Sequence, residues 1–131
     1  MATHTIEIKF NFSGETKDED RENYDKLYIT IRKLLVNKLK FAKHIVTSDY
    51  FIHTSKFTEK HVREQIDIAT KDCIWTNKTH LVISTYTLWR ENKTLKSLHS
   101  TYYRNKYRRW VKISPSNLYL ELRKSTKKYH S

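Results

Sequence analysis

The segment TLKSLHSTYYRNKYRRW, residues 94–110, decides how many helices the fold is expected to contain. As a strand, residues 102–110 would carry basic and aromatic side chains on both faces and would have no apolar side. The helical period instead aligns a nearly continuous aromatic and apolar stripe, in which Lys106 is the main exception. The stripe consists of Leu95, Leu98, His99, Tyr102, Tyr103, Lys106, Tyr107 and Trp110. The spacing therefore predicts a helix whose aromatic side packs on the body and whose other side is rich in Arg.

The residues before this segment alternate between strand and helix patterns. Apolar and polar residues alternate strictly at the start of the chain, and apolar residues then recur at helical spacing. We expect Thr58 to cap the second helix and Cys73 to be a core residue. The predicted elements are strands over residues 5–12, 45–53 and 80–89, helices over 18–43 and 58–74, and a turn over 90–93.

The C-terminal end is expected to close the fold with a hairpin. Residues 111–113 and 118–124 have β patterns and are separated by Ser-Pro-Ser-Asn. The alternative is a helix capped by Ser114 with Pro115 at its first position. We expect residues 1–124 to form a single α+β domain and residues 125–131 to be a flexible basic tail. The predicted element order is β-α-β-α-β-α-β-β, a mixed sheet of about four to five strands packed with three helices.

Positive charge is concentrated in the last third of the chain. The net charge is +12 and the pI is near 9.8. Residues 90–131 hold 12 Lys or Arg against two acids, Glu91 and Glu121, whereas residues 1–89 hold 14 against 12. A charge of this sign favours nucleic acid as the partner, ahead of anionic membranes or acidic proteins.

The composition excludes several classes of enzyme. Gly14 and Pro115 are the only residues of their kinds. Phosphate-binding loops, dinucleotide fingerprints and nucleophile elbows all need small residues that this chain lacks. Cys73 is the only cysteine, which rules out an intrachain disulfide and Cys-rich zinc modules. We expect neither a metal site nor a cofactor, because the histidines show no ligand spacing.

Source and location are inferred from the same composition. Scarce Gly, Pro and Ala beside abundant Lys, Asn, Ile and Tyr suggest an AT-rich gene, as in many viruses and mobile elements. The first residues alternate polar and apolar, unlike a signal peptide, and no apolar run is long enough to span a bilayer. We expect a cytoplasmic protein in a reducing compartment, without membrane contact.

The predicted function is nucleic-acid binding through contacts with the phosphate backbone of DNA or RNA. Each Lys or Arg near a phosphate displaces a condensed counterion, which gives affinity without sequence reading. The candidate contact residues are Arg104, Arg108, Arg109, Lys112, Arg123, Lys124, Lys127 and Lys128. The aromatic side chains of residues 102–110 are assigned to the core rather than to base stacking.

Two alternative functions stay open. A metal-independent ribonuclease of toxin type would use His99, Tyr103 and Arg104, which would lie within one helical turn. A basic adaptor or inhibitor would bind an acidic protein surface instead. Homodimerisation is compatible with each of these functions. We expect a binding protein more than an enzyme.

Overall fold

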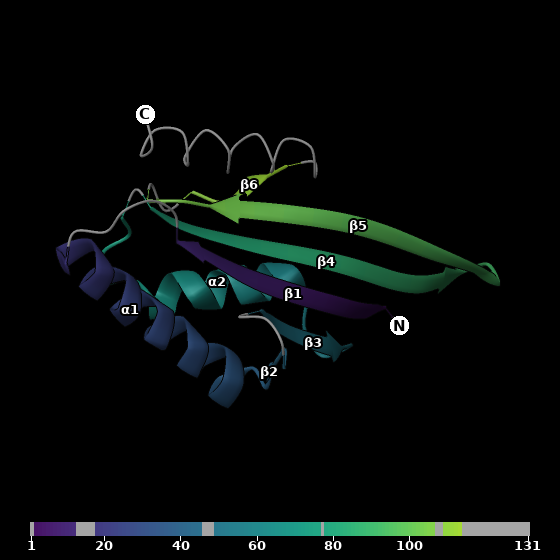
Figure 1. Cartoon of the computed structure of the whole chain (residues 1–131). Coiled ribbons are helices and arrows are strands. Elements are labelled where there is room, and N and C mark those ends of the chain that lie inside the picture. Colours follow the sequence, from purple (N-terminus) through teal and green to yellow (C-terminus); the bar gives the residue numbers. More distant parts are fainter. Residues whose placement is uncertain (1, 13–17, 46–48, 77, 107–108, 114–131) are drawn as a thin grey trace.

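The protein is an α+β structure built on one antiparallel sheet (Figure 1). The computed structural model describes residues 2–12, 18–45, 49–76, 78–106 and 109–113. Within these ranges, six strands lie in the order β2-β3-β1-β4-β5-β6, with every neighbouring pair antiparallel. The elements are β1 (Thr3–Phe12), α1 (Asp18–Lys33), the π-helical turn η1 (Leu34–Lys38), β2 (Ala42–Lys43), β3 (Tyr50–Thr54), α2 (Glu59–Ala69), β4 (Thr79–Glu91), β5 (Thr94–Arg104) and β6 (Val111–Lys112).

The core lies between the sheet and the two α-helices, which cover one face of it (Figure 1). Strand β1 alternates as its sequence predicts, so that Ile6 and Ile8 are fully buried. The helices present side chains spaced three or four residues apart to the same layer. The buried residues of this layer include Ile6, Ile8, Leu27, Ile31, Leu35, Val62, Ile66, Leu81 and Ile83. Burial of each such side chain contributes about 1.5–3 kcal/mol.

The predicted helix over residues 94–110 is wrong, because residues 94–104 form β5. This strand pairs with β4 in an unbroken register from Glu91↔Thr94 to Leu81↔Arg104. Tyr102 and Tyr103, which a helix would place on one side, point to opposite faces of the sheet. The fold therefore has two α-helices in the described ranges, rather than three, and its sheet is antiparallel rather than mixed.

A two-residue turn joins β4 to β5 and permits this pairing. Asn92 and Lys93 both have positive φ, 50° and 68°. Turns of this kind match the right-handed twist of the flanking strands, and asparagine adopts positive φ more readily than most residues. The turn predicted over residues 90–93 is thus a tight hairpin connection.

The other predicted elements are confirmed with shifted ends. The first helix ends before Lys43, because Leu39 bonds back to Leu34 and Lys40 takes a φ of 66°. Thr58 caps α2 as predicted, and α2 ends at Ala69, short of the buried Cys73. The strand predicted over 45–53 corresponds to β3, Tyr50–Thr54, and residues 46–48 lie outside the described residues.

The strand predicted over residues 111–113 is confirmed as β6 at Val111–Lys112, where it pairs with β5. Residues 118–124, the alternative helix at Ser114 and Pro115, and the predicted tail over 125–131 lie outside the described residues.

The turn at Lys93 generates the first prediction. Lys93→Gly should raise the free energy of unfolding by about 0.5 kcal/mol, because glycine adopts positive φ without steric cost. Lys96→Gly, which places glycine inside β5, should lower it by about 0.5–1 kcal/mol. Urea denaturation measures both, and a Lys93→Gly variant less stable than the parent would contradict the hairpin geometry.

Candidate nucleic-acid interface

Of the eight predicted phosphate-contacting residues, the structure describes Arg104, Arg109 and Lys112, and Arg104 is not on the surface. Arg104 is only 1% exposed, at the end of β5. Arg109 and Lys112 are exposed around β6. Arg108, Arg123, Lys124, Lys127 and Lys128 lie outside the described residues. Arg104 consequently presents no free guanidinium to an external phosphate.

Arg104 is held between α2 and two tryptophans. It lies opposite Leu81 in the β4–β5 register, on the face that the helices cover. Its guanidinium is 3.8 Å from the centre of the Trp75 ring and 5.7 Å from that of Trp110. Its Nη1 donates to Oδ1 of Asp67 on α2. Asp67 thus neutralises the charge of Arg104, and the guanidinium lies over the Trp75 ring. These contacts join β5 to the helix layer.

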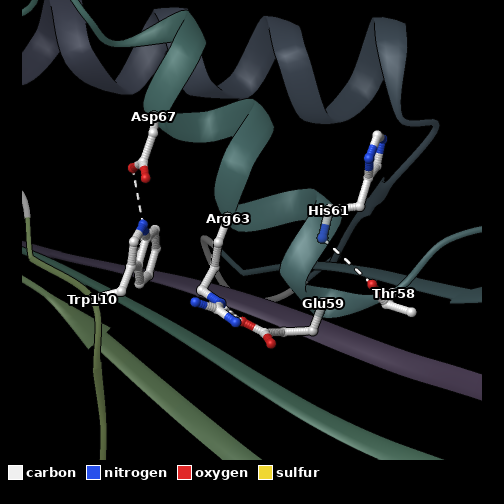
Figure 2. A network of polar contacts seen from close by, with 6 residues as sticks. All are labelled: Thr58, Glu59, His61, Arg63, Asp67 and Trp110. Carbon is white, nitrogen blue, oxygen red and sulfur yellow. Dashed lines mark hydrogen bonds and ion pairs between the residues drawn. The ribbon is translucent and has the colours of Figure 1, made fainter.

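Helix α2 presents a line of charged residues to β5, here called the α2–β5 seam: Glu59, Arg63 and Asp67 (Figure 2). A spacing of four residues places the three on one side of the helix. Arg63 donates to Glu59, and its guanidinium lies 3.9 Å from the centre of the Tyr102 ring. Trp110 Nε1 donates to Asp67 Oδ1 at 2.9 Å, as Figure 2 shows.

The seam is built to hold the helix in place. Burial raises the pKa of Glu59, and the charges of Arg63 and Lys112 oppose that rise. Arg63 and Arg104 each bind a carboxylate and an aromatic ring, so their charges are used within the fold. A hollow of about 510 Å³ beside the seam is lined by Asp67, Ile68, Lys71 and Arg104. The seam is therefore a positioning element for β5.

The three residues of the ribonuclease alternative are not brought together. His99 and Tyr103 are four residues apart on a strand, which separates their Cα atoms by about 13 Å. Arg104 projects from the opposite face of the same strand. The expected grouping within one helical turn is wrong, since it depended on the helix that the structure replaces with β5.

Tyr103 is instead part of a buried pair with His80. The Tyr103 hydroxyl and His80 Nδ1 are hydrogen-bonded, and the two rings stack at 5.7 Å. Both side chains are buried, 4% and 1% exposed. Burial lowers the pKa of His80 from its ordinary 6.5 to about 4. Tyr103 is buried as predicted, but on the sheet face opposite α1 and α2 and so outside the core between the sheet and the helices.

The exposed cations of this region lie on the β4–β5 hairpin. Its outer half, residues 86–99, is here called the ribbon. Strand β1 pairs with β4 only as far as Leu88, so the last residues of β4 pair with β5 alone. Arg90, Lys93 and Lys96 are exposed there, and Glu91 is the one acid of the ribbon. The contact residues predicted from the sequence did not include these three. The Asn92-Lys93 pair is the signal that could have indicated an exposed hairpin here, since asparagine is favoured in two-residue hairpin turns.

The side of the ribbon that faces away from the helices carries aromatic and imidazole rings. Residues paired directly across the strands share a face. The registers place His53, Thr5, Tyr86 and His99 in one row across β3, β1, β4 and β5. Thr5 Oγ1 and His53 Nδ1 are 2.8 Å apart, and the centres of the Tyr86 and His99 rings are 4.4 Å apart.

Within the described ranges, no group of three or more His, Cys, Asp or Glu side chains is arranged to hold a metal ion. No helix in the part of the chain that the structure describes is long and apolar enough to cross a membrane. Comparison of the chain with protein-family models, curated proteins and solved structures gave no significant match.

The Asp67–Arg104 pair generates a prediction about stability. Asp67→Ala should lower the free energy of unfolding by about 2–4 kcal/mol, because it removes the carboxylate that neutralises a buried guanidinium. The matched control is Asp72→Ala, an exposed aspartate just beyond α2, with an expected change within about 0.5 kcal/mol. Equal effects of the two substitutions in urea denaturation would show that the pair does not hold β5 to α2.

His80 generates a prediction about pH. The pKa of His80 is lower in the folded state than in the unfolded state, so its contribution to stability is complete above pH 6.5 and is lost as pH falls towards 4. The loss at pH 4 relative to pH 7 should amount to about 2–3 kcal/mol. His80→Gln should flatten this part of the stability profile measured by urea denaturation.

The exposed His99 provides the control for this experiment, and His99→Gln should keep the parental profile. The raised pKa of Glu59 makes the folded state more stable as pH falls, which is opposite to the effect of His80. Because the parent and both variants contain Glu59, this effect is the same in all three proteins. A parental slope in His80→Gln would contradict the assignment of a buried, neutral His80.

Proposed function

We propose that the chain is a nucleic-acid-binding protein that contacts the phosphate backbone through the basic ribbon and the neighbouring β6 edge. The observation that carries the proposal is the charge of residues 90–131, where 12 Lys or Arg oppose two acids. The described part of this stretch supports it, because Arg90, Lys93, Lys96, Arg109 and Lys112 are exposed.

The proposal differs from the sequence interpretation in which residues make contact. Arg104 is assigned a positioning role, because its guanidinium is buried against Trp75 and bound to Asp67. Arg90, Lys93 and Lys96 take its place. Their charges are opposed within the ribbon by Glu91, whose carboxylate is 3.9 Å from Lys96 Nζ. An exposed ion pair of this length is weak and leaves the ribbon able to attract a polyanion.

The proposed activity is binding without catalysis. Within the described residues, the two cations closest to carboxylates are Arg63, which is part of the α2–β5 seam, and Arg104, which binds Asp67 of that seam. His99 is exposed and projects from the face of β5 opposite to Arg104. No specific contact favours the ribonuclease or the adaptor as a second candidate, and each is an outcome of the experiment below.

The test is a fluorescence-anisotropy titration of labelled DNA and RNA at several salt concentrations, with and without EDTA. The parent should bind, and its affinity should fall by about 20-fold or more between about 50 and 200 mM salt as counterion release weakens. The triple variant Arg90→Glu, Lys93→Glu, Lys96→Glu should bind at least about 30-fold more weakly and with a smaller salt slope.

The matched control reverses three exposed lysines on the helices, Lys26, Lys33 and Lys60, and changes the net charge by the same amount. This control should lose much less affinity than the ribbon variant. Equal losses in the two variants would mean that only net charge matters, which contradicts an interface on the ribbon. Failure of the parent to bind at about 50 mM salt would contradict nucleic-acid binding itself, and EDTA-resistant RNA cleavage would favour the ribonuclease.

A further inference from the structure

The ring-bearing face of the ribbon continues into a hollow. Successive residues on one face of a strand lie two positions apart. The row of His53, Thr5, Tyr86 and His99 is therefore followed by Thr3, Leu88 and Ser97, and then by Arg90 and Leu95. The hollow has a volume of about 340 Å³ and is lined by Thr3, His53, Leu88, Trp89, Arg90 and Leu95.

The lining of this hollow combines three kinds of contact. Leu88 and Leu95 provide apolar walls, and Leu95 is 60% exposed. His53 provides an imidazole at one side and Arg90 a guanidinium at the other. The Tyr86 and His99 rings, which contact each other at a tilt of 45°, lie in the adjoining row. A flat aromatic ring that carries hydrogen-bonding groups and is linked to a phosphate would match these contacts. The ring would contact the leucines and aromatic side chains, its polar groups could bond to His53, and the phosphate could bind Arg90.

The charges around this face favour a polyanion at its outer end. Arg90 lines the hollow, and Lys93 stands at the tip of the hairpin. Two acids of the same face lie on the other side of Tyr86. Glu7 pairs with Ser84 and Phe51, and Asp49 Oδ2 is 3.9 Å from Lys9 Nζ. The potential is therefore most positive from Tyr86 outward, in the direction of the hollow.

We propose that this face binds single-stranded nucleic acid, with an unpaired base in the hollow beside Leu95 and a second base against the Tyr86–His99 pair. Arg90 and Lys93 hold the connecting phosphates. The proposal rests on the proposed function and specifies the form of nucleic acid. Bases inside a duplex are stacked on each other and cannot lie flat against side-chain rings, whereas every unpaired base has a free π-face.

The chain offers a matched pair of substitutions for the test. Leu95 and Leu98 are exposed leucines of β5, 60% and 55% exposed, but they point to opposite faces of the ribbon. Leu95→Ser combined with His99→Ala changes the proposed face. Leu98→Ser combined with Ser100→Ala changes the other face. Circular dichroism checks that both variants fold.

Binding is measured by anisotropy with an oligothymidylate of about 15 nucleotides, an oligouridylate of the same length, and a DNA duplex. The parent should bind the single strands more tightly than the duplex. The Leu95→Ser, His99→Ala variant should lose about 10-fold or more in affinity for single strands while its salt slope stays unchanged, because stacking releases no counterions. The Leu98→Ser, Ser100→Ala variant should bind as the parent does.

Two results overturn this inference and leave the proposed function intact. One is salt-dependent binding of the parent that is equal for duplex and single strands. The other is an unchanged affinity of the Leu95→Ser, His99→Ala variant for single strands. A parent that binds no nucleic acid at about 50 mM salt overturns both proposals together.

Discussion

Strand β4 is paired along nearly its whole length on both sides, and the rest of the fold depends on this constraint. Residues 79–88 pair with β1, and residues 81–91 pair with β5. Because side chains alternate along a strand, these two registers decide which residues of three strands face the helices. They place Ile8, Ile83 and Tyr102 in one row beneath α2, and they carry the hairpin beyond the end of β1.

The position of Arg104 follows from that register. Its partner Leu81 lies in the core layer, so the Arg104 side chain must enter the same layer, where an unpaired charge would be strongly destabilising. The Asp67 carboxylate neutralises the guanidinium, which also lies near the rings of Trp75 and Trp110. The ion pair with Asp67 connects α2 to β5. The helices thereby cover one face of the sheet, and the other face stays exposed along the ribbon.

The sequence predicts well those elements whose own pattern determines them. The alternation of β1, the Thr58 cap and the buried Cys73 are all local signals, and all are confirmed. Residues 94–104 are different, because their conformation depends on pairing with β4 and on a counter-ion, Asp67, that is distant in sequence. A buried arginine hides the strand pattern, since Arg104 occupies a position that periodicity expects to be apolar. The candidate interface is on the ribbon rather than on an Arg-rich helix face because residues 94–104 form a strand.

The most direct test of a nucleic-acid interface on the ribbon is an amide NMR titration of the chain with an oligothymidylate. The account predicts the largest chemical-shift changes at residues 86–99 and at His53, and small changes at the exposed positions of α1, such as Lys26 and Lys33. Changes confined to α1 and α2, with the amides of β4 and β5 unmoved, would contradict it.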